Sequence, residues 1–470
     1  MDIALILNNI VGKKNVLLDT ECGSYNQDWT GKYISTPLAV VKPASTLEVS
    51  QVVRACYENE VAIVPISGNT GLSGGTSANN AVMLSLERLN KIQEIKTQSR
   101  IAIVDAGVIL SNLHSAVEKF DLVFPLTFGA KGSSMVGGVL STNAGGSNVL
   151  KYGNTRTLCM GLEVVLPDGQ VLDLMSELHK DNTGYDLKDL IVGAEGTLGI
   201  ITAAVLKLSP RPVAYTTAMI ATGSLDNALK VLNILQEKTG GGVEAFEYMP
   251  KNYIETHLKK IPNSRPPFDK LYDYNIMLEI GSTIIGDSIS SVTGENMLTK
   301  SIEEILSQLL ASGELLDAVI AQSESQRIEM WERREASAEI TITNEPLIIT
   351  DIALPLEKIS IFIKKMDTII QQIDPGSRDL TVAHLGDGNI HYAIYPTKFD
   401  EILFDKLTNH LEELTQELGG SFSAEHGIGL SKKKSMARRK DPVALEVMRS
   451  IKMGLDPKNL MNPGKVLPDS

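Results

Sequence analysis

The chain has 470 residues, 43% hydrophobic and 21% charged, a globular composition that excludes disordered, collagen-like and coiled-coil proteins. At roughly 100–200 residues per domain, this length predicts two or three domains. The 44 basic and 57 acidic residues give a net charge of −13, so no nucleic-acid partner is expected.

Cysteine content and the N-terminus indicate a soluble protein of a reducing compartment. Cys22, Cys56 and Cys159 form no C-x-x-C pair, which disfavours a disulfide scaffold, a Cys-based zinc site and a Cys-ligated iron–sulfur cluster. The first 15 residues lack a basic start and a small-residue cleavage site, and 132–150 is too polar for a transmembrane segment. We expect a cytoplasmic (bacterial) protein; peripheral membrane contact and a mature mitochondrial form stay open.

The first 210 residues alternate helix and strand signals. Ser45-x-x-Glu48 is a capping box that begins a predicted helix with Val49, Val52, Val53 and Cys56 on one face. Pro167-Asp168-Gly169 predicts a hairpin turn. Strands are predicted at 61–66, 82–86, 101–104, 162–166, 171–174 and 199–208.

The character changes after the Ser-Pro-Arg-Pro sequence at 209–212, which predicts a domain boundary. Helix-period stretches near 224–237, 299–311, 355–372 and 400–418, with strands between them, predict a second α+β domain. The predicted domains are therefore 1–211 and 212–420, followed by a C-terminal segment at 421–470.

Glycines gather in three clusters of the first domain, at 65–75, at 132–146 with Tyr152-Gly153, and at 193–202. Successive backbone N–H groups in such loops form anion-binding nests, and Ser and Thr add hydroxyl donors. The pattern predicts a pyrophosphate held by backbone amides without a lysine, although any single cluster could be a tight turn. Neither G-x-G-x-x-G nor G-x-x-x-x-G-K-[ST] occurs, which disfavours a Rossmann site and a P-loop.

A competing interpretation is the nucleophile elbow of α/β-hydrolases, because Gly71-Leu72-Ser73-Gly74-Gly75 matches G-x-S-x-G after a predicted strand. The elbow must be followed by a helix, and the polar residues 76–80 disfavour one.

The loop 65–75 resembles the P-x-[SG]-G-x-[ST]-x-L-x-G-G loop of the vanillyl-alcohol oxidase and p-cresol methylhydroxylase-type flavoproteins, and the other clusters match in order and spacing. The resemblance implies an α+β fold with a two-subdomain FAD-binding domain (1–211), a substrate or cap domain (212–420) and a C-terminal segment closing on the flavin. Loops 65–75 and 132–146 would wrap the FAD pyrophosphate, and 195–201 would follow the adenine and ribityl side. Asn69 stands where some members attach flavin through His, so non-covalent FAD is expected.

The residues assigned to FAD by this resemblance are Pro65, Ser67, Gly68, Asn69, Thr70, Gly71, Gly74, Gly75, Gly132, Ser133, Gly137, Gly138, Thr142, Asn143, Gly145, Tyr152, Gly153, Glu195, Gly196, Gly199, Ile201, Asn462 and Lys465.

Two histidines bracket a predicted hairpin turn in the sequence His384-Leu-Gly-Asp-Gly-Asn-Ile-His391. A loop over 386–389 would place His384 directly opposite His391, with Cβ atoms roughly 4.5–5.5 Å apart. With Glu425 as a third ligand, the set describes a catalytic Zn²⁺ site, although Mn²⁺ and Fe²⁺ use similar ligands. The alternative is a hairpin that merely carries two histidines.

The sequences HLGDGNIH and AEHGIG (424–429) resemble the D-2-hydroxy acid dehydrogenase branch, which includes D-lactate, glycolate and D-2-hydroxyglutarate dehydrogenases. Residues 180–187 and 246–249 are most similar to the D-2-hydroxyglutarate members, and 456–465 matches the closing motif of the family. The resemblance implies metal ligation by His384, His391 and Glu425, and places Asn462 and Lys465 near the flavin ring.

Trp331-Glu-Arg-Arg-Glu fits the W-x-x-R-E motif of the family, which singles out Arg334 for the substrate carboxylate; a solvated charged helix face is the alternative. His426 is expected to take the hydroxyl proton. Two departures concern the D-2-hydroxyglutarate branch, because Ile349 stands where a Lys is typical and Ala393 where an Asn is typical. These departures leave D-lactate or another D-2-hydroxy acid open as substrate.

The sequence therefore predicts FAD-dependent, metal-assisted oxidation of a D-2-hydroxy acid to the 2-oxo acid by hydride transfer to flavin N5. The alternatives are a metal-dependent hydrolase that uses the His/His/Glu site and a flavoprotein-like scaffold without catalysis. Quinone, electron-transfer flavoprotein, cytochrome and oxygen remain open as electron acceptor, and a homodimer remains open as the assembly.

Overall fold

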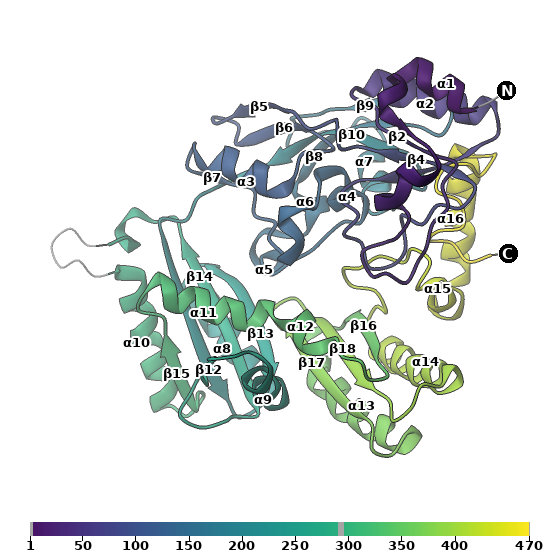
Figure 1. Cartoon of the computed structure of the whole chain (residues 1–470). Helices are drawn as coiled ribbons and strands as arrows, with labels where there is room; N and C mark the ends of the chain where they lie inside the picture. The colour runs from purple at the N-terminus through teal and green to yellow at the C-terminus, as the bar shows by residue number, and fades with distance from the viewer. Residues whose placement is uncertain (1–2, 290–295, 470) are drawn as a thin grey trace. The chain divides into compact units, whose positions relative to one another are not determined.

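The protein, described by a computed structural model over residues 3–289 and 296–469, consists of two compact units (Figure 1). Unit 1 contains Met1–Gly146, Gly153–Pro210 and Glu425–Ser470, and unit 2 contains Ser147–Tyr152 and Arg211–Ala424. The main crossing from unit 1 to unit 2 falls inside the Ser-Pro-Arg-Pro sequence, between Pro210, which pairs with Leu122, and Arg211.

The first sheet of unit 1 has the order β1 (Val16–Leu17), β2 (Ala39–Val41), β4 (Ala81–Ser85) and β3 (Ala62–Ile66), with β2 and β3 parallel to β4. Helix α1 (Ile3–Val11) precedes it, and α2 (Thr46–Glu58) connects β2 to β3. The predicted cap is confirmed, since the Ser45 side chain accepts from Glu48 N. Glu48 reaches back to Ala44 N, one residue before the usual capping-box partner.

The second sheet of unit 1 is antiparallel, with the order β5 (Ile92–Lys96), β6 (Ile101–Asp105), β10 (Ile200–Lys207), β8 (Cys159–Val165) and β9 (Val171–Leu174). The predicted hairpin is confirmed, because Val165 pairs with Val171 and Gly169 takes a φ of 87° in the turn. The remaining elements are α3 (Leu110–Glu118), β7 (Leu122–Val123) paired with β11 (Ser209–Pro210), α4 (Val136–Ser141), α6 (Thr155–Leu158) and α7 (Leu187–Ile191).

The C-terminal residues return to the first sheet of unit 1. After α15 (Lys433–Arg439) and α16 (Pro442–Leu455), Met461 forms a parallel bridge with Ile63 of β3. The buried Lys452 ammonium donates to Asp456 and to the Thr197 and Met461 carbonyls. The tail is thus an integral part of unit 1.

Unit 2 is built on an antiparallel sheet with the order β15 (Asp317–Ile320), β12 (Ala214–Thr222), β14 (Tyr274–Ser282), β13 (Val243–Pro250), β17 (Arg378–His384), β18 (Asn389–Tyr395) and β16 (Ile348–Ala353) (Figure 1). The four predicted helices appear as α8 (Leu225–Lys238), α10 (Met297–Ala311), α13 (Ile359–Ile373) and α14 (Glu401–Glu417). Helix α13 begins later than predicted, because Pro355 and a 3-10 turn at Leu356–Lys358 precede it.

The two faces of this sheet carry different helices. Helices α8, α10, α13 and α14 share a core with Phe246, Ile352 and Ile390. Helices α9 (Lys251–Lys260), α11 (Glu324–Glu335) and α12 (Ser337–Thr341) share another with Met249, Val382 and Ala393. Because strand side chains alternate between faces, Glu247, Asp351, His384 and His391 all lie on the α11 face.

Over residues 3–289 and 296–469, no helix combines the length and apolarity that a membrane span requires.

Candidate active site

Two of the glycine clusters pack directly against each other in unit 1. A Cβ atom on Gly68 would lie 2.1 Å from the Ser133 carbonyl oxygen, and one on Gly138 would lie 3.2 Å from Ser67. The Thr70 and Ser134 hydroxyls are 3.0 Å apart. Only glycine allows the two backbones to approach so closely. The loop after β3 therefore packs directly against the start of α4.

The third cluster and the tail join the first two. A Cβ atom on Gly196 would lie 2.5 Å from Pro65 Cγ, so these segments are in close contact. The Asn462 amide donates to the carbonyl oxygens of Gly75 and Glu195, at 3.1 and 2.8 Å. The three glycine clusters, which we call the glycine loops, therefore meet beside the C-terminal tail.

The glycine loops also contain positions that no other protein atom approaches. A Cβ atom built on Gly71 or on Gly132 would meet nothing within 4 Å. Backbone amides next to open space, with Ser and Thr hydroxyls nearby, suit a pyrophosphate. The donor set thus fits FAD.

The structure does not support the nucleophile elbow. After Gly75 the chain runs through turns into β4, not into a helix. The Ser73 hydroxyl donates to the His426 carbonyl at 2.8 Å, so its hydrogen serves a structural bond.

The other predicted flavin residues have varied partners. The Asn69 amide donates to Gln27 O and accepts from Thr76, so its side chain is held within the loop. Thr142 donates to Gly138 O, and Asn143 accepts from Arg156 N.

Tyr152 belongs to unit 2, in α5 (Val149–Tyr152), where its hydroxyl and the Lys151 ammonium both bind the Glu244 carboxylate at 2.9 Å. The other three predicted residues belong to unit 1. Gly153 lies between α5 and α6, Gly199 directly precedes β10, and Ile201 lies in β10.

The environments of Glu195 and Lys465 in unit 1 shift their pKa values. Both oxygens of Glu195 accept backbone N–H bonds, from Ile428 at 2.7 Å and from Gly429 at 2.8 Å. Burial raises the pKa of the Glu195 carboxyl, and the two N–H donors oppose that shift. Burial and the nearby Lys433 lower the pKa of Lys465 to about 8, and its Nζ donates to the Pro463 carbonyl at 3.3 Å.

The His384–His391 hairpin differs in register from the prediction. His384 pairs with Asn389, and His391 pairs with Val382, so the two histidines are diagonal and not directly opposite. The turn spans 385–388, because Gly388 takes the left-handed conformation (φ 86°) and Asp387 accepts from Asn389 N. The rings still share a face, with centroids 5.3 Å apart.

The direct neighbour of His384 is Glu247, on the adjacent strand β13. Its carboxylate lies 2.9 Å from His384 Nδ1 and accepts from Arg334 Nε at 2.8 Å, and Arg334 Nη2 lies 3.4 Å from His384 Nε2. Burial alone would raise the pKa of Glu247, but the positive charges of His384 and Arg334 and their hydrogen bonds lower it. Arg333 points elsewhere, since its guanidinium donates to Arg265 O.

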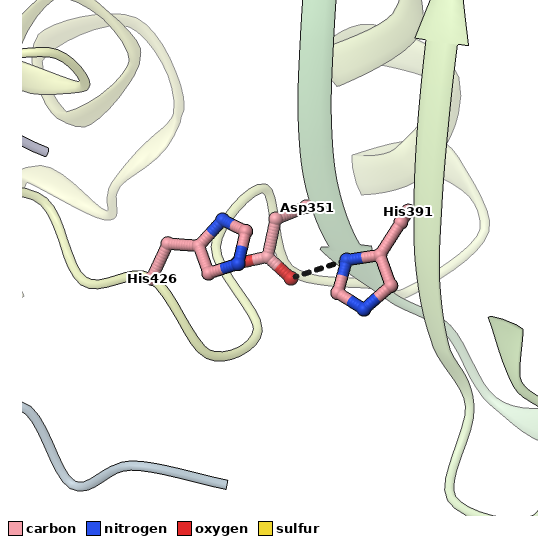
Figure 2. A group of neighbouring side chains, drawn as sticks. All are labelled: Asp351, His391 and His426. Carbon is pink, nitrogen blue, oxygen red and sulfur yellow. Dashed lines mark ion pairs between the residues drawn. The ribbon is translucent and has the colours of Figure 1, made fainter. Parts of the chain in front are cut away.

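A second carboxylate accompanies His391. Asp351 stands directly opposite it on β16, and Asp351 Oδ1 lies 3.8 Å from His391 Nδ1. A dashed line marks this ion pair in Figure 2. Asn389 donates to the same carboxylate at 2.9 Å. We call Glu247, Arg334, Asp351, His384 and His391 the charge cluster.

The sequence interpretation did not assign Glu247 and Asp351 to the site. Acidic residues inside otherwise apolar strands were the available signal, because such a carboxylate is buried only when it is paired: β13 carries Glu244 and Glu247, and β16 carries Asp351.

Glu425 and His426 belong to unit 1 and directly follow Ala424, whose N–H donates to the Asp351 carbonyl in unit 2. The Glu425 carboxylate lies against Gly145, and the His426 carbonyl accepts from Ser73. Of the predicted metal ligands, His384 and His391 thus belong to unit 2 and Glu425 belongs to unit 1.

Solved structures of similar fold agree with this architecture. A p-cresol methylhydroxylase with substrate bound has a TM-score of 0.72 at 16% identity, covering 99% of this chain and 96% of that one. An alkyldihydroxyacetonephosphate synthase also has a TM-score of 0.72, at 18% identity over 99% of this chain and 86% of that one. The chain thus has the two-domain fold of the p-cresol methylhydroxylase type, as predicted.

Sequence relatives narrow the class. A family described as "FAD binding domain" matches residues 37–175, and one described as "FAD linked oxidases, C-terminal domain" matches residues 211–466. A D-2-hydroxyglutarate dehydrogenase from Danio rerio is 36% identical over 95% of this chain and 81% of its own length, and one from Xanthomonas citri pv. viticola is 34% identical over 94% and 92%. The chain belongs to the FAD-linked oxidase family and is an FAD-dependent 2-hydroxy acid dehydrogenase. Relatives include mitochondrial and bacterial proteins.

Proposed function

We propose that the protein oxidises a D-2-hydroxy acid to the 2-oxo acid, with FAD bound at the glycine loops and a divalent metal bound by His384, His391 and Glu425. The observation that carries this proposal is the placement of His384 between a buried carboxylate and a buried guanidinium. A metal ligand beside a cation suits an α-hydroxy carboxylate, whose hydroxyl seeks the metal and whose carboxylate seeks the cation.

The surroundings of His384 support its role as a ligand. Its Nδ1 lies against the Glu247 carboxylate, which favours a proton on Nδ1 and leaves Nε2 to coordinate. A carboxylate behind a ligating histidine is the usual support of a metal site, and a His/His/Glu set is typical of zinc. The metal would supply Lewis acidity that lowers the pKa of the substrate hydroxyl.

The remaining roles fall to side chains of this chain. Arg334 binds the C1 carboxylate, and Glu247 holds the guanidinium by its Nε so that the other nitrogens can face the substrate. His426 takes the hydroxyl proton as a neutral imidazole. Bound FAD supplies the two-electron acceptor for the hydride that leaves C2.

The two departures from the D-2-hydroxyglutarate pattern lie together. Ile349 and Ala393 are directly opposite each other on β16 and β18, two residues along from the Asp351–His391 pair. Both pairs lie on the α11 face of the sheet. Because this pair offers no charge or hydrogen-bond donor to a second carboxylate, we favour a 2-hydroxy acid with a short uncharged side chain, such as D-lactate. D-2-hydroxyglutarate, named for the relatives, is the alternative.

The test is anaerobic bleaching of the oxidised flavin band by a panel of D- and L-2-hydroxy acids, with and without a chelator. We expect bleaching by one D-acid, loss of bleaching on chelation and its recovery with Zn²⁺. Bleaching that a chelator leaves untouched would remove the metal from the proposal. Preference for D-2-hydroxyglutarate would contradict the role given to Ile349 and Ala393.

A colourless protein that takes up no FAD would favour the metal-dependent hydrolase instead. The electron acceptor, a homodimeric assembly and the compartment (bacterial cytoplasm, a peripheral membrane position or a mitochondrion) remain predictions from the sequence.

A further inference from the structure

The segment that carries His426 is bound through its backbone N–H groups to the Glu195 side chain. Glu195 accepts from Ile428 N through Oε1 and from Gly429 N through Oε2. Two consecutive N–H groups that converge on one anion form a nest, and here the anion belongs to the protein itself. Both carboxylate oxygens are therefore used to hold this segment.

The backbone conformation at this nest requires glycine at two positions. Gly427 and Gly429 have φ values of 71° and 49°, in the left-handed region. A Cβ atom on Gly427 would lie 2.8 Å from Glu195 Oε1, and one on Gly429 would lie 2.2 Å from the Ser73 carbonyl oxygen. The contact with Glu195 thus depends on both glycines.

Glu195 is itself held in an uncommon conformation. Its φ is 52°, in the left-handed region that non-glycine residues rarely adopt. Its N–H donates to the Ser141 carbonyl at 2.8 Å, at the end of α4, and its carbonyl accepts from Asn462. The carboxylate is therefore carried by a backbone that the glycine loops and the tail immobilise.

The other side of the segment is bound by Ser73. The Ser73 hydroxyl donates to the His426 carbonyl at 2.8 Å, and the Ser73 carbonyl accepts from Leu430 N at 2.7 Å and from Ser431 N at 3.2 Å. His426 thus lies between an anchored carbonyl and the two amides bound by Glu195. We infer that Glu195 is a positioning residue for His426, acting through the Ile428 and Gly429 amides. This inference rests on the proposed role of His426 as the base.

The test compares Glu195→Gln with a matched variant, Glu163→Gln, in the FAD-loaded protein. Glu163 is also a carboxylate in unit 1 that accepts two hydroxyl bonds, from Thr46 and Thr202, but it lies on β8. Glutamine at 195 has one acceptor oxygen and places an NH₂ group against a second N–H donor. We expect faster hydrogen exchange over 425–431 in Glu195→Gln and no change there in Glu163→Gln.

Kinetic measurements test whether the Glu195→Gln change lowers the rate through His426. We expect Glu195→Gln to keep FAD and KM, to lower kcat by about 10–100-fold, and to shift the pH profile of kcat. In a His426→Ala background the same change should cost nothing further, and Glu195→Asp should recover part of the rate. Unchanged exchange, an unchanged kcat, loss of FAD, or an equal loss in the His426→Ala background would each overturn the inference. Full activity of His426→Ala would instead overturn the proposed base.

Discussion

The glycine loops of unit 1 and the charge cluster of unit 2 are built in opposite ways. The loops owe their shape to missing side chains, since a single Cβ atom on Gly68 would collide with the Ser133 backbone. The charge cluster owes its shape to side chains that neutralise one another on one face of a sheet, with Glu247 at its centre. Cofactor binding and chemistry should therefore be separable by mutation, with different physical signatures.

The largest expected effect is that of His426→Ala, which should lower kcat by about 10²–10⁴-fold, the usual contribution of a general base. FAD should stay bound, because the glycine loops do not depend on this imidazole. Stopped-flow reduction and the flavin spectrum measure the two properties separately. His410→Ala, on α14, is the matched control and should leave kcat unchanged. A His426→Ala protein that loses its flavin would show that this unit 1 imidazole also supports cofactor binding.

The next effect concerns the centre of the charge cluster. Glu247→Gln leaves Arg334 buried without its counter-charge, so the free energy of unfolding should fall by about 3–5 kcal/mol. Urea denaturation measures it. Glu345→Gln breaks an exposed pair with Arg378 and should cost less than about 1 kcal/mol. Equal losses of unfolding free energy in the two variants would show that burial does not increase the contribution of the Glu247–Arg334 ion pair to stability.

In the glycine loops, Gly68→Ala should lower the free energy of unfolding by about 3 kcal/mol, because the new methyl group meets a backbone carbonyl. Gly71→Ala should leave stability unchanged and weaken FAD binding, because the space beside Gly71 holds no protein atom within 4 Å. Thermal unfolding and flavin titration distinguish the two. Gly71→Ala protein that binds FAD normally would argue against a cofactor at this position.

The smallest effect concerns Lys465, which has no ion pair with an acidic residue in the described part of the chain, unlike Arg334. Its folded pKa of about 8 lies below the ordinary 10.5, so the protonated side chain destabilises the fold below pH 8. The penalty disappears as the pH rises from 8 to 10.5. Lys465→Met should stabilise the FAD-free protein by about 2–3 kcal/mol at pH 7.

The increase in the free energy of unfolding caused by Lys465→Met should be smaller at pH 9.5 than at pH 7. Denaturation at both pH values measures this difference. Lys434→Met, at an exposed position, should change stability by less than about 0.5 kcal/mol. A gain that grows with pH would contradict the assigned shift.

The same contrast explains what could be predicted from the sequence. Each of the glycine loops is a continuous segment of the chain, so its composition and spacing could be recognised in the sequence. Four helices of unit 2, α8, α10, α13 and α14, were predicted from their helical period. The charge cluster joins strands far apart in sequence, and Glu247 and His384 are separated by 137 positions. No local pattern records that pairing.

Register was the hardest feature to predict. The turn between His384 and His391 contains two glycines, and the structure places only Gly388 in the left-handed conformation. That choice moves the pairing by two residues, which keeps both histidines on the predicted face but changes their partners.

The bridge between Ile63 and Met461 has a consequence for biosynthesis. During translation the whole of unit 2 leaves the ribosome before the tail that completes unit 1, so the later half of the chain can finish folding first. The first sheet of unit 1 must wait for residues near the end of the chain. Translation that stops before Met461 would therefore yield a finished second unit attached to an incomplete first one, with exposed strand edges that chaperones and proteases recognise.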